Sequence, residues 1–286
     1  MIKDIDDSKA PLLEHLVELR SRLIRSVVVI LVLFVACFFV AEDIYIFLVQ
    51  PLADVFDREG ARLIYTELTE VFFTYVKVAM FTALFIGFPF VAAQLWLFIA
   101  PGLYRNEKGA FLPFLVMTPV LFFTGGALVY YVIFPMAWVF FLGFETIGGD
   151  GTLPIQLEAK VAEYLSLVMK LIFAFGLSFE LPLLLTLMAR VGLTSSKGLA
   201  DKRKYSIVMA FVAAAILTPP DPISQISLAV PIILLYEISI IAVRIVEKRK
   251  KKREAAADDD DDGPSGSDAG DGPEEVVEET DFNTGR

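Results

Sequence analysis

Long apolar stretches separated by short polar segments fill the chain as far as residue 246. A bilayer core of about 30 Å needs roughly 20 helical residues to cross it. Helices are the expected spanning structure because unpaired backbone groups cannot face lipid. The pattern therefore predicts an all-α integral membrane protein with six transmembrane helices. The apolar stretches run over 23–41, 71–99, 111–141, 164–187, 205–217 and 223–246.

The last two stretches differ from the others. Residues 205–217 would form only about 20 Å of helix at 1.5 Å per residue, and the proline-rich turn TPPDP (218–222) follows at once. We therefore expect a tight hairpin of short fifth and sixth helices. Such a hairpin requires either a locally thin membrane or shielding by other protein.

The distribution of charge predicts the orientation of the helices. The net charge of −10 comes from an acidic tail beyond Glu254, and the rest of the chain is slightly basic. Basic residues gather before the first stretch, between the second and third, between the fourth and fifth, and after the sixth. The positive-inside rule then puts both termini in the cytoplasm. We divide the chain into a cytoplasmic amphipathic lead-in (1–22), a six-helix membrane domain (23–246) and a basic, then acidic, disordered tail (247–286).

The composition argues against catalysis and cofactors. The chain has one histidine and one cysteine, Cys37 inside the first stretch, so a transition-metal site is not expected. It shows no Gly-rich phosphate loop and no nucleophile–base pair at catalytic spacing. The sequence predicts a protein that is not an enzyme, with no cofactor and no nucleic-acid partner.

Carboxylates stand where anionic headgroups should repel them. Glu18 lies in LLEHLVELRSRLIR (12–25), directly before the first apolar stretch, and Glu107 lies in FIAPGLYRNEKGAF (98–111) at the same predicted membrane level. One interpretation is a simple i,i+4 ion pair between Glu18 and Arg22. The other is that both acids hold a ligand with two cations, for which the forked guanidinium of arginine is best suited.

Polar residues also occur at membrane depth. Glu180 lies far from either end of its stretch, and Pro182 beside it should kink the helix. A charge facing lipid costs at least about 2.5 kcal/mol, so Glu180 should face protein or water, in a functional or a purely structural role. Thr218, Asp221 and Gln225 flank the TPPDP turn. They could cap helices there or make a functional contact.

Four segments of the chain resemble the signature segments of the TatC family, the polytopic core subunits of the twin-arginine protein translocase. They are HLVELRSRL (15–23), QLWLFIAPGLYRNEK (94–108), FGLSFELP (175–182) and LTPPDPISQ (217–225). The resemblance implies a glove-shaped six-helix bundle in the cytoplasmic (inner) membrane. It also implies a receptor for the twin-arginine signal peptides of folded precursors, which are exported with the proton-motive force. The expected partners are the single-span subunits TatA and TatB, further copies of the chain and membrane lipid.

The resemblance also assigns roles to individual residues. Glu18 and Glu107 match the acids that bind the two arginines, and Glu180 matches an intramembrane glutamate on the concave face. Arg20, Phe98 and Pro101 match neighbouring positions of the signal site. Pro51 matches a proline of an outward loop. The polar contact surface for TatA and TatB is matched by Thr218, Asp221 and Gln225.

A secondary transporter of a small solute that uses Glu180 is the main alternative function. Such a transporter should show repeated halves with matching broken helices, and the sequence shows no internal repeat. The sequence departs from the family pattern at Gly102, Asn106 and Ala215, of which only Ala215 touches the expected partner surface.

Overall fold

The structure is a computed structural model that describes residues 4–56, 62–103, 112–146, 153, 155–218 and 222–261. Its regular secondary structure in these ranges is helical apart from two isolated β-bridges, Ile64 with Lys160 and Thr146 with Ile155. The helices are α1 (Asp4–Phe39), α2 (Ala41–Ala53), α3 (Glu70–Leu103), α4 (Leu112–Leu128), the π-helical turn η2 (Val129–Ile133), α5 (Phe134–Leu142), α6 (Val161–Phe179), α7 (Leu181–Arg190), α8 (Ser196–Asp201), α9 (Arg203–Leu217) and α10 (Pro222–Asp261).

Five helical segments in the described ranges are long and apolar enough to cross a membrane, so the chain is a multi-pass membrane protein. They are His15–Phe39, Glu70–Phe98, Pro113–Leu142, Val161–Arg190 and Gln225–Arg249. The predicted fifth span corresponds to α9, which has only 15 residues. A sixth crossing therefore stays a prediction.

The expectation of a short sixth helix is wrong. Helix α10 has 40 residues and continues through the basic segment into the first aspartates of the tail. The physical reason is local, because KRKKKREAAA consists of strong helix formers and contains neither Gly nor Pro. The domain boundary predicted after residue 246 thus falls inside a helix, and the chain divides by its contacts into the units Met1–Glu247 and Lys248–Arg286.

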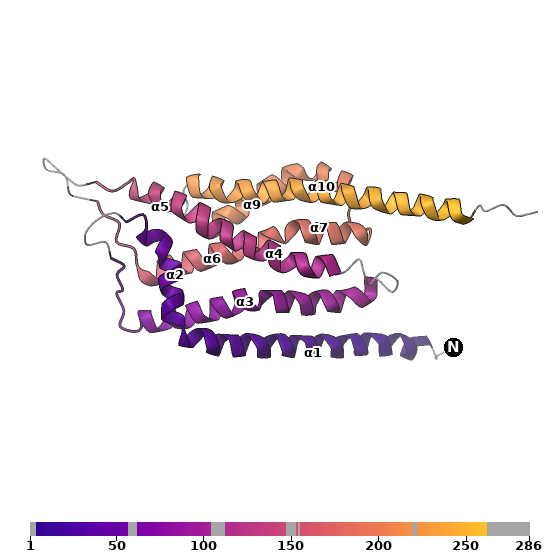
Figure 1. Ribbon diagram of the computed structural model, residues 1–286, viewed down its shortest axis with the longest axis horizontal. Coiled ribbons are helices and arrows are strands. Elements are labelled where there is room, and N and C mark those ends of the chain that lie inside the picture. Colours follow the sequence, from indigo (N-terminus) through magenta and orange to yellow (C-terminus); the bar gives the residue numbers. More distant parts are fainter. Residues whose placement is uncertain are drawn as a thin grey trace, which may run out of the picture. The chain divides into compact units, whose positions relative to one another are not determined.

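The centre of the first unit depends on close approach between α4 and α6, which lie against each other (Figure 1). A Cβ atom at Gly125 would stand 2.6 Å from the carbonyl oxygen of Phe175, and one at Gly176 would stand 2.7 Å from the ring of Phe122. Small residues let helix backbones approach within a membrane, where van der Waals packing replaces the hydrophobic effect between helices. Phe122 and Phe175 are fully buried in this contact.

Helix α2 runs across the other helices at one end of this unit (Figure 1). Pro51 is buried inside α2 and has no N–H, so the carbonyl of Phe47, four residues earlier, loses its helical partner. The phenol of Tyr130 donates a hydrogen bond of 2.7 Å to that carbonyl, and its ring stacks on Phe47. Tyr164 donates a second bond, of 3.1 Å, to the Leu48 carbonyl. The proline predicted to lie in an outward loop therefore belongs to a helix that two tyrosines fasten to the bundle.

The turn η2 supplies one of these tyrosines. Tyr130 lies in this single π-helical turn between α4 and α5, and it is 9% exposed, whereas its neighbour Tyr131 is 68% exposed. A π-turn inserts one residue into the helical ladder and so changes the direction of the side chains around it. Here it directs Tyr130 towards the carbonyl that Pro51 leaves unpaired.

We predict that Tyr130→Phe lowers the free energy of unfolding in detergent by about 1–2 kcal/mol. The variant keeps the stacked ring but leaves the part-buried Phe47 carbonyl without its partner, and an unpaired buried polar group costs roughly 1–3 kcal/mol. Tyr131→Phe is the matched control, because the same atom is removed from an exposed ring. Equal stability of the two variants, measured by chemical denaturation, would contradict the role assigned to Tyr130.

Candidate functional site

The first candidate site lies where α1 packs beside α3 (Figure 1). Glu18 on α1 forms the ion pair that one interpretation of the sequence predicted. Arg22 donates from Nε at 3.0 Å and from Nη2 at 2.6 Å, and both bonds end on Oε1 of Glu18. The carboxylate already holds a guanidinium of the chain itself.

Two contacts connect this pair to the second sequence segment of the predicted site. Arg22 Nη1 lies 3.4 Å from the Gln94 side-chain oxygen on α3. The ring of His15 stacks on that of Phe98 with centroids 4.1 Å apart and planes 10° from parallel. His15 Nδ1 also stands 3.9 Å from Oε2 of Glu18. Segments far apart in the sequence, around Glu18 and Phe98, therefore meet through His15 and Arg22.

The structure accounts for part of the predicted signal site. Glu18, Arg20 and Phe98 are described, and Arg20 is exposed. Pro101 lies within the last turn of α3, but its side chain is outside the described part of the structure, and Glu107 lies outside the described residues.

His15, Arg22 and Gln94 were not predicted as site residues, although all three belong to the segments that carried the resemblance. His15 is the chain's only histidine and precedes Glu18 by three residues, a spacing that places both on one helix face. Gln94 precedes Phe98 by four residues and shares its face of α3 in the same way. Spacing relative to Glu18 and Phe98 was thus the signal available in the sequence.

The arrangement leaves one edge of a carboxylate open. The Glu18 side chain is 37% exposed, and its Oε1 receives both bonds from Arg22, while Oε2 receives neither of them. An ionised carboxylate has about four acceptor positions on two oxygens. Chemically, Glu18 can accept further charge-assisted hydrogen bonds from an external cation without releasing Arg22.

A second polar site surrounds Glu180, at the break between α6 and α7. Glu180 ends one helix and begins the next, and Pro182 follows within the first turn of α7. The side chain is 5% exposed and therefore faces protein rather than lipid. Its Oε1 is buried and has no hydrogen-bond partner in the described part of the chain.

Two buried side chains from other helices complete the site around Glu180. The Thr118 hydroxyl on α4 lies within hydrogen-bonding range of the carboxyl group. The same hydroxyl accepts a 2.9 Å bond from the indole N–H of Trp96 on α3, so its own proton is available for Glu180. Trp96 and Thr118 are 5% and 2% exposed. The Thr118 hydroxyl, itself paired with Trp96, thus lies beside the intramembrane carboxyl group, a proximity that sequence patterns alone did not reveal.

The predicted partner-contact residues lie at the junction of α9 and α10. Thr218 ends α9 and donates a 2.8 Å hydrogen bond to the Ala214 carbonyl, and Gln225 donates one of 3.2 Å to the Phe211 carbonyl. Neither is the bond that the capping interpretation expected, in which the side chain accepts from a backbone N–H. Thr218 bonds back to its own helix, and Gln225 joins α10 to α9. Asp221 lies outside the described residues.

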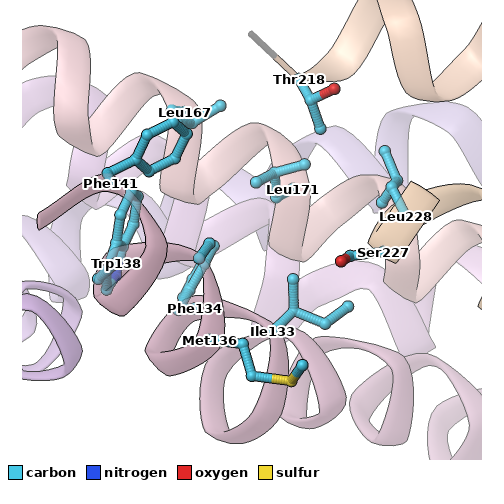
Figure 2. A pocket seen from close by; sticks show the side chains of 11 residues that line it. Ile133, Phe134, Met136, Trp138, Phe141, Leu167, Leu171, Thr218, Ser227 and Leu228 are labelled. Atoms are coloured by element: carbon cyan, nitrogen blue, oxygen red, sulfur yellow. The ribbon is translucent and has the colours of Figure 1, made fainter. Parts of the chain in front are cut away.

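Thr218 also borders a small cavity of about 70 Å³ (Figure 2). The figure shows Thr218, Leu228 and Ser227 on the right of the cavity and the aromatic rings of Phe134 and Trp138 on the left. The indole nitrogen of Trp138 is buried without a partner in the described part of the chain. No group of three metal-ligating side chains occurs within the described ranges.

The helices and the two carboxyl groups define the class of protein. Five helices within the described ranges long enough to cross a membrane, a carboxylate held between α1 and α3, and a second carboxyl group buried within a crossing segment describe a polytopic membrane protein with two polar clusters. The family described as Sec-independent protein translocase protein (TatC) matches residues 14–231. The chain belongs to the TatC family, and the resemblance seen in the sequence is confirmed.

Curated relatives named "Sec-independent protein translocase protein TatC" match most of the chain. The protein from Magnetococcus marinus is 54% identical over 243 residues, which cover 85% of this chain and 87% of that one. The protein from Rickettsia prowazekii is 44% identical, with 82% and 92% covered, and that from Escherichia coli K12 is 38% identical, with 82% and 88% covered.

A solved structure supports the fold. The crystal structure of a twin-arginine translocase receptor, TatC, superposes with a TM-score of 0.71 at 36% identity, covering 82% of this chain and 99% of that one. Together with the family match, it identifies the chain as a component of a protein translocase, which replaces the alternative of a small-solute transporter.

We predict that Thr118→Val lowers the free energy of unfolding by about 2 kcal/mol, because it leaves the Trp96 N–H unpaired and removes the donor to Glu180. Thr124→Val is the control, since this exposed threonine bonds only to the Val120 carbonyl of its own helix. A double-mutant cycle with Glu180→Gln should give a coupling above about 0.5 kcal/mol. Equal effects of the two threonine variants would contradict the arrangement.

Proposed function

We propose that the chain is the signal-peptide receptor of a twin-arginine translocase in the cytoplasmic membrane, with both termini in the cytoplasm. The observation that carries the proposal is the Glu18 carboxylate. It binds the guanidinium of Arg22 through one oxygen and keeps the other open at the α1–α3 junction. A side chain that already orients one guanidinium is suited to receive another.

Binding of an arginine at Glu18 follows from charge-assisted hydrogen bonding. The incoming guanidinium donates to Oε2, while Arg22 stays on Oε1 and fixes the carboxylate's rotamer. Lysine offers a point charge without the planar fork, so a lysine pair should bind less well than an arginine pair. The stacked rings of His15 and Phe98 form an aromatic surface beside the carboxylate, on which the peptide's apolar segment can lie.

In this proposal Glu107 is the second acid, assigned on the family resemblance because it lies outside the described residues. Arg20 and Pro101 contribute to the rim of the same site. Two carboxylates from separate segments would then bind the two arginines of the signal, which explains why acids are kept beside anionic headgroups.

The wider assembly is part of the proposal. Helix α9 serves as the sixth crossing, and the α9–α10 junction with Thr218, Asp221 and Gln225 receives the single-span partners TatA and TatB. Copies of the chain associate within the complex, and folded precursors cross with the proton-motive force and without a catalytic residue or cofactor. The bonds of Thr218 and Gln225 to the carbonyls of α9 support this junction as a pre-formed surface.

The acid pair can be tested by binding. We expect Glu18→Gln combined with Glu107→Gln to weaken binding of a fluorescent twin-arginine signal peptide to the purified protein by at least tenfold, since each charged hydrogen bond contributes about 1.5–3 kcal/mol. A twin-lysine peptide should bind the parent protein more weakly than the twin-arginine peptide does. The double variant should bind the two peptides about equally.

Glu158→Gln is the matched control for this measurement, because Glu158 is exposed and pairs with Arg62 outside the α1–α3 junction. It should leave peptide affinity unchanged. Parent-like affinity of the double variant, or an unchanged preference for arginine over lysine, would refute the assignment.

Glu180 is expected to act after recognition. Glu180→Ala should leave peptide affinity within about twofold of the parent value, since the carboxyl group is buried among α3, α4 and α6 rather than at the α1–α3 junction. Transport of a folded precursor into inverted membrane vesicles should fall. Parent-like transport by this variant would remove Glu180 from the functional residues.

A further inference from the structure

A wide groove lies between α3 and α6, which run side by side (Figure 1). Its volume is about 630 Å³, and its walls are mainly apolar side chains such as Met80, Leu84, Met169 and Phe173. Two lysines, Lys77 on α3 and Lys170 on α6, line the same groove. Neither belongs to the acid site or to the Glu180 site.

Both lysines lie within helical segments that cross the membrane. Lys77 is about 10 Å from the start of α3, and Lys170 about 14 Å from the start of α6, at 1.5 Å per residue. Both helices start at the end of the unit that carries α2 (Figure 1), and both lysines are exposed. A charged side chain at such a position is expensive unless its head reaches the interface or a counter-charge.

The nearby acids are engaged elsewhere. Glu70 accepts backbone hydrogen bonds from Thr66 and Glu67 through one oxygen and from Ala162 through the other. Lys77 borders a second cavity together with Glu67 and Glu70, but forms no ion pair with either.

The acids of α6 are engaged as well. Glu163 lies 3.8 Å from Lys160, and Glu180 is buried beside Thr118. Within the described ranges neither Lys77 nor Lys170 has an acidic partner within 4 Å. The groove therefore presents two positive charges that the chain itself does not neutralise.

We infer that this groove binds an anionic phospholipid, with the phosphate between Lys77 and Lys170 and an acyl chain along the apolar walls. The apolar walls and the two lysines together indicate the kind of ligand that fits the groove. Apolar walls at membrane depth suit a hydrocarbon chain, and two ammonium groups favour a negative headgroup over a zwitterionic one. On the orientation proposed above, the site draws its lipid from the outer leaflet. The inference is independent of signal-peptide recognition.

The test compares lipid retention by native mass spectrometry, with the detergent-purified full chain and added phosphatidylglycerol or phosphatidylcholine. We expect the parent protein to retain phosphatidylglycerol preferentially. Lys77→Gln combined with Lys170→Gln should reduce that preference roughly thirtyfold, since each basic residue near a membrane surface contributes about 1 kcal/mol. Lys77→Arg combined with Lys170→Arg should keep the preference for phosphatidylglycerol. This result would show that loss of positive charge, and not misfolding, accounts for the effect of the glutamine variant.

Lys160→Gln is the matched control, because Lys160 lies at the same end of α6 but faces Glu163. It should leave the preference intact. An unchanged preference in the double glutamine variant would overturn the site. A second outcome would also overturn the site. If that variant lost a co-expressed single-span subunit while its lipid retention stayed unchanged, the groove would hold a protein helix.

Discussion

An irregularity in one helix leaves polar groups that other helices must meet, and this constraint governs the arrangement of the bundle. Where Pro51 removes a backbone donor, a π-helical turn places Tyr130 against the carbonyl left unpaired. Where Glu180 interrupts a span, Thr118 from α4 lies beside it, and Trp96 from α3 donates to the Thr118 hydroxyl. In both cases a local break in one helix determines which side chain a distant helix must supply.

The same constraint explains why the two carboxylate sites differ in character. Glu18 lies at a helix junction at one end of the unit, where its side chain is part-exposed and paired with a charged arginine. Glu180 lies at the α6–α7 break, where it is 5% exposed and lies beside the neutral hydroxyl of Thr118. An exposed, ion-paired carboxylate suits recognition of a charged peptide. A buried one with an unpartnered oxygen suits a later step in which its surroundings change.

Much of this could be predicted from the sequence. Apolar stretches of bilayer length gave a multi-pass helical protein, because hydrocarbon thickness and helical rise fix the length of a span. Four short segments gave the family, which the comparisons confirm. The i,i+4 spacing of Glu18 and Arg22 predicted an ion pair that the structure contains, since neighbours on one helix face need no tertiary information. The predicted length of the last helix was too short, because residues of high helix propensity follow the apolar stretch and extend α10 beyond it.

Only the tertiary structure decided the contacts between segments distant in sequence. No local pattern connects Trp96, Thr118 and Glu180, or places Tyr130 on the carbonyl that Pro51 frees, because these pairings depend on how helices pack at the glycines of α4 and α6. The stacking of His15 on Phe98 likewise follows from the packing of α1 against α3. The sequence by itself determined where the long apolar helices lie and which family the chain belongs to, since these depend on composition and spacing along one helix. It did not show helix α2, which lies in the predicted outward loop. The partners of the buried polar groups depend on helix contacts, which hydropathy does not encode.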